Sequence, residues 1–279
     1  MKGLAALAGS ATFRHGVHPA EMKQLTEGLA IERMPFVDEY VLPLSQHTGA
    51  PSRPLVGPGM RVKRGQMIAA ADGFISTALH APVTGTVEAV ELRPHPNGQR
   101  MLSVVIRTDP FSSQRVEASP QRSVEDLSVQ EVARKVQEAG IVGLGGAAFP
   151  SHVKLQLPEG KQAKFVILNG CECEPYLTCD HRIMVDRPAT VLRGLRLIMR
   201  QLGAERGYVG VEMNKPDAIE ALRAHAAQFD DVEIVPLKVK YPRAPRRCSS
   251  TRSSTRRCPA GSCPSTWRSW STTWAQRRR

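Results

Sequence analysis

The feature that most constrains the fold is a regular alternation of helix and strand patterns over residues 125–242. The first helix is marked by Ser128 and Glu131, which have the spacing of a capping box, and by Gly140 just beyond its last turn. Its apolar positions follow i, i+3, i+4, i+7 spacing and are Val129, Val132, Ala133, Val136 and Ala139.

Further along, short apolar runs alternate with longer amphipathic ones. The pattern predicts strands at 165–168, 207–211 and 232–237, and helices at 188–202 and 216–229. This order predicts an α/β domain with a largely parallel sheet. In such sheets ligands bind at the carboxyl ends of the strands, so the loops that follow the strands are the candidate sites.

Residues 36–110 have a different pattern. Short runs at 37–44, 66–70, 86–92 and 101–108 are separated by Gly- and Pro-containing turn signals, which predicts a small all-β module. We therefore expect a mixed lead-in at 1–35, the β module at 36–110, a Ser/Pro/Gln-rich linker at 111–124, the α/β domain at 125–242 and a basic tail at 243–279.

The net charge of +12 comes mostly from that tail, which holds ten Arg and no Lys or acidic residue. Subtracting ten from twelve leaves +2 on residues 1–242, so a nucleic-acid interface would depend on the tail alone, and we expect no nucleic-acid partner. No apolar run approaches the ~20 residues of a membrane helix. Gly3 and Gly9 interrupt the short apolar start, which argues against a secretory signal.

The first candidate loop is the segment Gly-Leu-Gly-Gly-Ala-Ala-Phe-Pro at 143–150. Glycines let backbone N–H groups approach a ligand closely, and a helix starting at Pro150 would attract phosphate. Lys154, one turn later, could reach the same anion. The alternative is a tight turn that packs a helix on the sheet, because the spacing matches neither a Walker loop nor G-x-G-x-x-G.

The second candidate loop is Asn-Gly-Cys-Glu-Cys-Glu-Pro-Tyr at 169–176, which leaves the end of a predicted strand. Glu172 and Glu174 could accept hydrogen bonds from ribose hydroxyls or an amide, and Asn169 can both donate and accept. With Cys179, the cysteines have the spacing C-x-C-x5-C, which lacks the C-x2-C pairs of zinc and iron–sulfur sites. We expect small, partly buried thiols here and no metal.

These two loops, with Gly-Val-Glu-Met-Asn-Lys-Pro at 210–216, resemble the C subunit of the Rnf-type ion-translocating electron transport complex. Further matching segments lie at 15–19, 21–23, 43–47 and 49–51, so the resemblance spans residues 13–242. The family is related to the flavin-bearing, NADH-binding subunit of respiratory complex I. The resemblance implies a barrel-type β module followed by a complex I flavoprotein-like α/β domain.

The resemblance also implies roles for the glycine loop. Phe149 would stack near the nicotinamide or adenine, and Lys154 would supply positive charge beside the flavin. The residues that would line flavin mononucleotide (FMN), with backbone amides toward its ribityl phosphate side, are Gly143, Gly145, Gly146 and Ala147.

For the second loop, the resemblance implies that Asn169 and Glu172 hydrogen-bond the flavin or its ribityl chain, and that Glu174 contacts NADH. The chemistry would be hydride transfer from nicotinamide C4 to flavin N5, which the cofactor supplies, so no catalytic side chain is expected.

Within the β module, residues 56–69 and 81–87 resemble a barrel-sandwich hybrid of the biotinyl/lipoyl type. The stretch Asp-Gly-Phe-Ile-Ser at 72–76 stands where a carrier domain has its modifiable lysine, and it contains none. We therefore expect a structural or docking module without lipoate or biotin. The histidines His18, His47 and His80 are expected to be structural rather than metal ligands.

The chain departs from the family after Pro242. The family continues with a Gly-rich stretch, another sheet segment and a domain whose C-x2-C-x2-C-x3-C-P runs bind two [4Fe–4S] clusters, and this chain has no such run. Our hypothesis is a reading-frame error, because dropping two bases from GC-rich codons after Pro242 gives helix- and strand-like sequences. The DNA sequence tests it.

An Arg/Ser/Trp tail without an apolar period should be disordered and should not complete the sheet. A strand edge and part of the nucleotide pocket would then stay open, which predicts weak or absent flavin binding by this chain.

The resemblance implies that the chain is a peripheral subunit on the cytoplasmic face of the bacterial inner membrane, where it would pass electrons between NADH and ferredoxin-type carriers. Its partners would be the membrane and iron–sulfur subunits of the complex. Alternatives are a cobalamin-reductase-type soluble flavoprotein, the quinone-reductase A subunit of the Na⁺-pumping enzyme and a non-catalytic docking protein. The intact glycine loop argues against the second of these.

Overall fold

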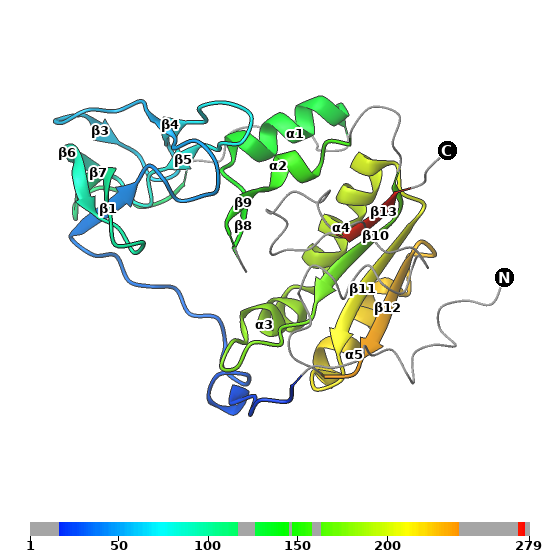
Figure 1. The fold of residues 1–279 in the computed structure, drawn as a ribbon. Coiled ribbons are helices and arrows are strands. Elements are labelled where there is room, and N and C mark those ends of the chain that lie inside the picture. The colour runs from blue at the N-terminus through cyan, green and yellow to red at the C-terminus, as the bar shows by residue number, and fades with distance from the viewer. Residues whose placement is uncertain (1–16, 117–125, 145–146, 158–162, 240–272, 277–279) are drawn as a thin grey trace. The chain divides into compact units, whose positions relative to one another are not determined.

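The structure is a computed structural model of the 279-residue chain, and it describes residues 17–116, 126–144, 147–157, 163–239 and 273–276. The chain forms two compact units. Residues 33–156 make up the first, called here the barrel unit, and residues 1–32 with 157–279 make up the second, called the α/β unit. Figure 1 shows the elements of both, and each unit is described by itself.

The barrel unit contains two antiparallel sheets. The larger has the order β1-β7-β6-β3, with β1 at Glu39–Pro43, β7 at Arg100–Thr108, β6 at Gly85–Pro94 and β3 at Arg61–Val62. The smaller has the order β2-β4-β5, at Arg53–Pro54, Met67–Ala70 and Leu79–His80. Between them lies a core of Leu44, Val62, Ile68, Ala69, Ala81, Val83, Val87, Val104 and Ile106. The predicted all-β module is confirmed.

The same unit includes the first predicted helix. Helix α1 spans Val129–Glu138, and Ser128 and Glu131 form the predicted capping box. Gly140 follows with φ of +69°, as expected for a residue that ends a helix. After it come the short strands β8 at Val142–Gly143 and β9 at Phe149–Pro150 and the one-turn helix α2 at Ser151–Lys154.

The division between the two compact units falls after Gln156 and not at the linker expected at 111–124, and the expected domain bounds stay a prediction. Helix α1 belongs with the barrel because Gln137 bonds the loop before β5 through its side chain and its carbonyl. The glycine loop and α2 follow it into the same unit.

The α/β unit has the parallel sheet that the alternation predicts. Strands β10 (Ala163–Gly170), β11 (Arg206–Glu212) and β12 (Val232–Leu237) lie side by side in that order and are parallel (Figure 1). Helices α4 (Pro188–Leu202) and α5 (Pro216–Ala226) have a proline in the first turn, and Gly203 ends α4 in the left-handed conformation. Their apolar faces and the sheet share one core that includes Val166, Leu192, Leu195, Val209, Val211, Leu222 and Ile234.

Two further elements were not predicted in this unit. Helix α3 spans Cys179–Asp186, and the 3-10 turn η2 spans Lys23–Leu25. Only His181 and Met184 of α3 are fully buried, so the helix has little apolar period from which it could have been recognised.

The tail does not leave the β10 edge open as expected. Strand β13, Thr273–Gln276, pairs antiparallel with β10 and extends the sheet to the order β12-β11-β10-β13. Pairing at a sheet edge depends on backbone N–H and C=O groups, so a segment without apolar periodicity can still fill it. The rest of residues 243–279, and with it the predicted disorder, lies outside the described residues.

Candidate functional site

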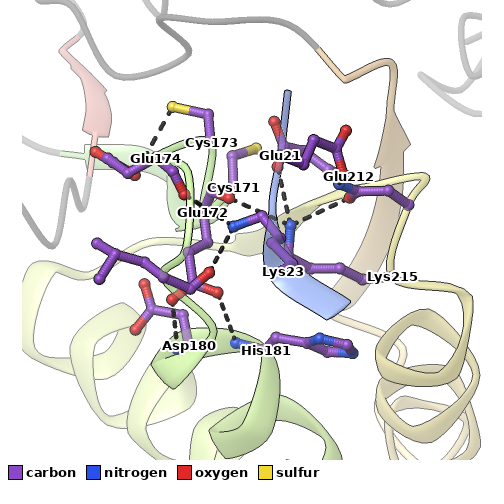
Figure 2. A network of polar contacts seen from close by, with 12 residues as sticks. Glu21, Lys23, Cys171, Glu172, Cys173, Glu174, Asp180, His181, Glu212 and Lys215 are labelled. Atoms are coloured by element: carbon purple, nitrogen blue, oxygen red, sulfur yellow. Dashed lines mark hydrogen bonds and ion pairs between the residues drawn. The ribbon is translucent and has the colours of Figure 1, made fainter. Parts of the chain in front are cut away.

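The carboxyl ends of β10 and β11 bring charged residues from three chain segments together (Figure 2). Because the two strands are parallel and pair Gly170 with Val211, the loop after β10 and the end of β11 lie at the same edge of the sheet. Glu172 comes from the first and Glu212 from the second. This is the edge at which ligands bind in α/β sheets.

Glu212 and Lys215 form a buried ion pair at this edge. Their side chains are 0% and 1% exposed, and Lys215 Nζ lies 2.9 Å from Glu212 Oε2. The ammonium also donates to the Asn214 side-chain oxygen at 3.1 Å and lies 3.5 Å from the Glu172 carbonyl. The other oxygen, Glu212 Oε1, is buried and has no hydrogen-bond partner within the described part of the chain. An unpaired buried acceptor is costly, so this oxygen would gain from a ligand N–H or O–H group, which could reach it only if the side chains that cover it move.

The N-terminal lead-in completes the cluster. Lys23, from η2, is 4% exposed and donates to the carbonyl oxygens of Glu174 at 3.0 Å and Leu177 at 2.5 Å. Burial, and to a smaller extent the positive charge of Lys215, lowers the pKa of Lys23. Glu21 accepts a hydrogen bond from Asn214 Nδ2 at 2.7 Å. The lead-in is thus part of the site rather than a separate segment.

Glu172, predicted to bind the flavin, holds the N-terminus of α3. Its Oε1 accepts from the Asp180 N–H at 2.9 Å and from the Cys179 thiol at 3.2 Å, and its Oε2 accepts from the His181 N–H at 3.3 Å. The residue is 3% exposed. Both carboxylate oxygens therefore already have partners in the protein.

The neighbours of Glu172 titrate abnormally. Burial, followed by the charges of Glu172 and Glu174, raises the pKa of Asp180 to about 6. Burial and the Glu172 carboxylate raise the pKa of the Cys179 thiol to about 11, so it is protonated at neutral pH. Glu172, Cys179 and Asp180 each offer one atom that could bind a metal ion, and these three atoms lie within 4.8 Å of one another. Both Glu172 oxygens accept backbone N–H groups of the first turn of α3, so we assign the Glu172 carboxylate as a cap of this helix.

The other predicted residues of this loop are less buried. Asn169 accepts a hydrogen bond from the Cys171 N–H at 3.0 Å and so shapes the turn after β10. Glu174 is half-buried, with one oxygen 3.9 Å from the Cys173 sulfur. Of the predicted acceptors in this loop, Glu174 is the carboxylate most open to a ligand.

The glycine loop lies in the barrel unit, so the predicted site residues come from both units. Gly143 is buried on β8, Ala147 is exposed, and Gly145 and Gly146 lie outside the described residues. Lys154 is 6% exposed, burial lowers its pKa, and its Nζ lies 6.0 Å from the centre of the Phe149 ring.

Two details of this loop differ from the sequence analysis. Helix α2 is a single turn and Pro150 precedes it, so a helix dipole contributes little to anion binding here. Phe149 is 7% exposed, so stacking on a nicotinamide or adenine would require its surroundings to move.

Comparison with known proteins assigns both parts of the chain. Residues 11–110 match the family model described as the RnfC barrel sandwich hybrid domain, and residues 136–268 match the Nuo51 FMN-binding domain. The chain belongs to the RnfC family. The Nuo51 match continues past Pro242, and the reading-frame hypothesis stays a prediction.

Two relatives named as C subunits of such complexes are about two fifths identical to this chain over the aligned residues. It is 41% identical over 253 residues to the C subunit of the Na⁺-translocating ferredoxin:NAD⁺ oxidoreductase complex of Acetobacterium woodii, covering 91% of this chain and 57% of the relative. It is 41% identical over 254 residues to the C subunit of the proton-translocating complex of Clostridium ljungdahlii, covering 91% and 55%. The chain thus spans about half the length of these curated relatives.

Each unit, taken by itself, carries groups of the kinds that would hold the FMN implied by the RnfC and Nuo51 matches. FMN carries a phosphate anion, several hydroxyl groups and a ring N–H. The buried cation of Lys154 beside the glycine loop fits the anion. The unpaired Glu212 oxygen and the half-buried Glu174 carboxylate fit hydroxyl or N–H donors.

Sequence reasoning missed three of the buried charges of this cluster, namely Lys23, Glu212 and Lys215. All three lie within segments that carry the family resemblance, at 21–23 and 210–216. Charged residues at the end of a predicted buried strand were the available signal, because charged side chains are seldom fully buried unless they are paired.

Among the described residues, no helix is both long and apolar enough to cross a membrane.

Proposed function

We propose that this chain binds FMN and NADH and passes electrons between NADH and a ferredoxin-type carrier, as a peripheral subunit of an ion-translocating membrane complex. Its relatives are named as subunits of ferredoxin:NAD⁺ oxidoreductase complexes, and one part of the chain matches an FMN-binding domain. The proposal includes the other subunits of such a complex as partners and the cytoplasmic face of the membrane as its location.

The observation that carries the proposal is the buried, acceptor-rich edge of the α/β unit, where Glu212 keeps one unpaired oxygen. A nucleotide with hydroxyl and N–H groups would satisfy that oxygen once the side chains that cover it move aside. The Glu174 carboxylate would accept a hydrogen bond from a hydroxyl or N–H group of NADH. Asn169 would shape the turn after β10, which leads to Glu174. Lys215 would hold the Glu212 carboxylate in place, and Lys23 would hold the backbone of the loop that carries Glu174.

In the barrel unit, Gly143, Ala147 and Lys154 would hold the phosphate end of FMN, together with Gly145 and Gly146. FMN, when bound, would supply the hydride-transfer and electron-transfer chemistry. The side chains position the two nucleotides and exclude water. The positive charge of Lys154 would stabilise negative charge on a flavin bound nearby.

Weak flavin binding was expected because an edge at β10 would stay open. Strand β13 pairs at that edge, so an open edge is no longer a reason to expect weak binding.

The test is to load the purified chain with FMN, remove the excess and record the visible spectrum. We expect bound flavin near one equivalent. A colourless protein would overturn the proposal and favour the docking-protein alternative.

A further inference from the structure

The loop of residues 72–76 in the barrel unit, which stands where carrier domains have their modified lysine, is held by other parts of the same unit. Gln137 of α1 donates to the carbonyl oxygens of Gly73 at 3.2 Å and Ser76 at 3.0 Å. His152 of α2 is 1% exposed and its Nε2 lies 2.8 Å from the Phe74 carbonyl oxygen. The elements on both sides of the glycine loop are therefore anchored on this barrel loop.

A second barrel loop, residues 46–50, reaches the glycine loop itself. The Thr48 hydroxyl donates to the Ala147 carbonyl at 2.5 Å, and the Thr48 N–H donates to the Ala148 carbonyl at 3.3 Å. One side chain and its own backbone thus hold two consecutive peptide groups of the glycine loop.

The loop that carries Thr48 is itself fixed. The Ala50 N–H donates to the Ile75 carbonyl at 3.0 Å. Gly49 has φ of +117°, and a Cβ added there would lie 1.9 Å from the Ile75 carbonyl oxygen. A residue with a side chain cannot take this place without moving the backbone. Thr48 is therefore presented from a rigid base.

The segment that Thr48 holds has an unfavourable conformation. Ala148 has φ of +47°, in the left-handed region that residues with a Cβ seldom occupy. Such a conformation persists only where the surroundings impose it, and it is found most often at binding sites. The two hydrogen bonds from Thr48 act on this residue and the one before it, and so help to impose it here.

We propose that Thr48 is a positioning residue for the flavin phosphate, and that the barrel forms part of the cofactor site by fixing the glycine loop. This inference rests on the proposed function, since it assumes that the glycine loop binds the phosphate of FMN. It gives the barrel a role other than that of a carrier or a detachable docking module.

The test compares Thr48→Val with Thr48→Ser, which keeps the hydroxyl. Affinities for FMN and for riboflavin, which lacks the phosphate, are measured in the full chain by quenching of flavin fluorescence. We expect Thr48→Val to weaken FMN binding by roughly three- to tenfold, the effect of one hydrogen bond, and to leave riboflavin binding unchanged. Thr48→Ser should bind FMN like the wild type.

Equal FMN affinity in Thr48→Val and the wild type would overturn the inference and leave the proposed function intact. Equal losses for FMN and riboflavin would also overturn it, because they would indicate general damage to the fold. A wild-type chain that binds neither flavin would overturn the proposed function and this inference with it.

A measurement on the wild type does not depend on the variants folding. FMN should slow amide hydrogen exchange in residues 46–50 more than riboflavin does, because a phosphate held next to Ala147 and Ala148 would stabilise the hydrogen bond from the Thr48 N–H to the Ala148 carbonyl. Equal protection by the two flavins would contradict the inference.

Discussion

At the scale of single residues, the α/β unit buries several ionisable groups at one edge of its sheet. Lys23, Glu172, Glu212 and Lys215 are each less than 5% exposed. Buried charges need partners: here Glu212 and Lys215 pair with each other, the two lysines donate to backbone carbonyls, and Glu172 accepts from backbone N–H groups. This arrangement leads to two predictions that concern individual side chains.

The first concerns the Glu212–Lys215 pair. Lys215→Met should lower the free energy of unfolding by about 3–5 kcal/mol, because it leaves a buried carboxylate without its cation. The double variant Glu212→Gln/Lys215→Met should lose less, since no buried charge remains. As a control, Asp231→Asn removes the exposed pair with Arg196 at 3.5 Å and should cost less than about 1 kcal/mol. Urea unfolding measures all three, and a double variant as unstable as the single one would show that the lone carboxylate is not the cause.

The second concerns Asp180. Its folded pKa of about 6 lies above its ordinary value of 3.8, so the folded state keeps the proton to a higher pH than the unfolded chain. The free energy of unfolding must therefore fall as the pH rises through this window. Asp180→Asn removes the effect and should be more stable than the wild type at pH 7, by on the order of 2 kcal/mol. This advantage should disappear near pH 4; an advantage independent of pH would show that the raised pKa is not its cause.

At the scale of elements, sequence reasoning succeeded where the local pattern and the fold agree. The capping box of α1, the proline starts of α4 and α5 and the parallel strands β10 to β12 were all predictable, because capping, proline geometry and apolar period are local signals.

The elements that sequence reasoning missed depend on distant partners. Helix α3 begins where the Glu172 carboxylate, seven residues before Cys179, accepts its first N–H groups. The turn η2 is held by Lys23, whose partners lie more than 150 residues away. No local pattern contains these contacts, so sequence reasoning placed the candidate site in the two loops and missed Lys23, Glu212 and Lys215.

This assignment of α3 can be tested at its first turn. Glu172→Ala should lower the free energy of unfolding by about 1–3 kcal/mol, because two backbone N–H groups lose their acceptor. Amide exchange of Asp180 and His181 should become faster. Glu174→Ala is the matched control, two residues away and half-buried, and should leave these amides unchanged. Unchanged exchange in Glu172→Ala would show that α3 does not depend on this cap.

At the scale of the whole molecule, the boundary between the units falls within what the sequence suggested was one domain. The linker at 111–124 separates the barrel strands from α1 in sequence, yet α1 and the glycine loop belong to the barrel unit. The lead-in, conversely, belongs to the α/β unit through Lys23 and Glu21. Tertiary contacts decide which unit each chain segment packs in, and composition and turn signals do not predict those contacts.

The central claim is that this chain holds FMN where NADH can reduce it. The most direct test is an anaerobic titration of the FMN-loaded wild-type chain with NADH, followed at the flavin band near ~450 nm. We predict that the band bleaches and that about one NADH is consumed for each flavin. A flavin that stays bound and oxidised in excess NADH would contradict this claim.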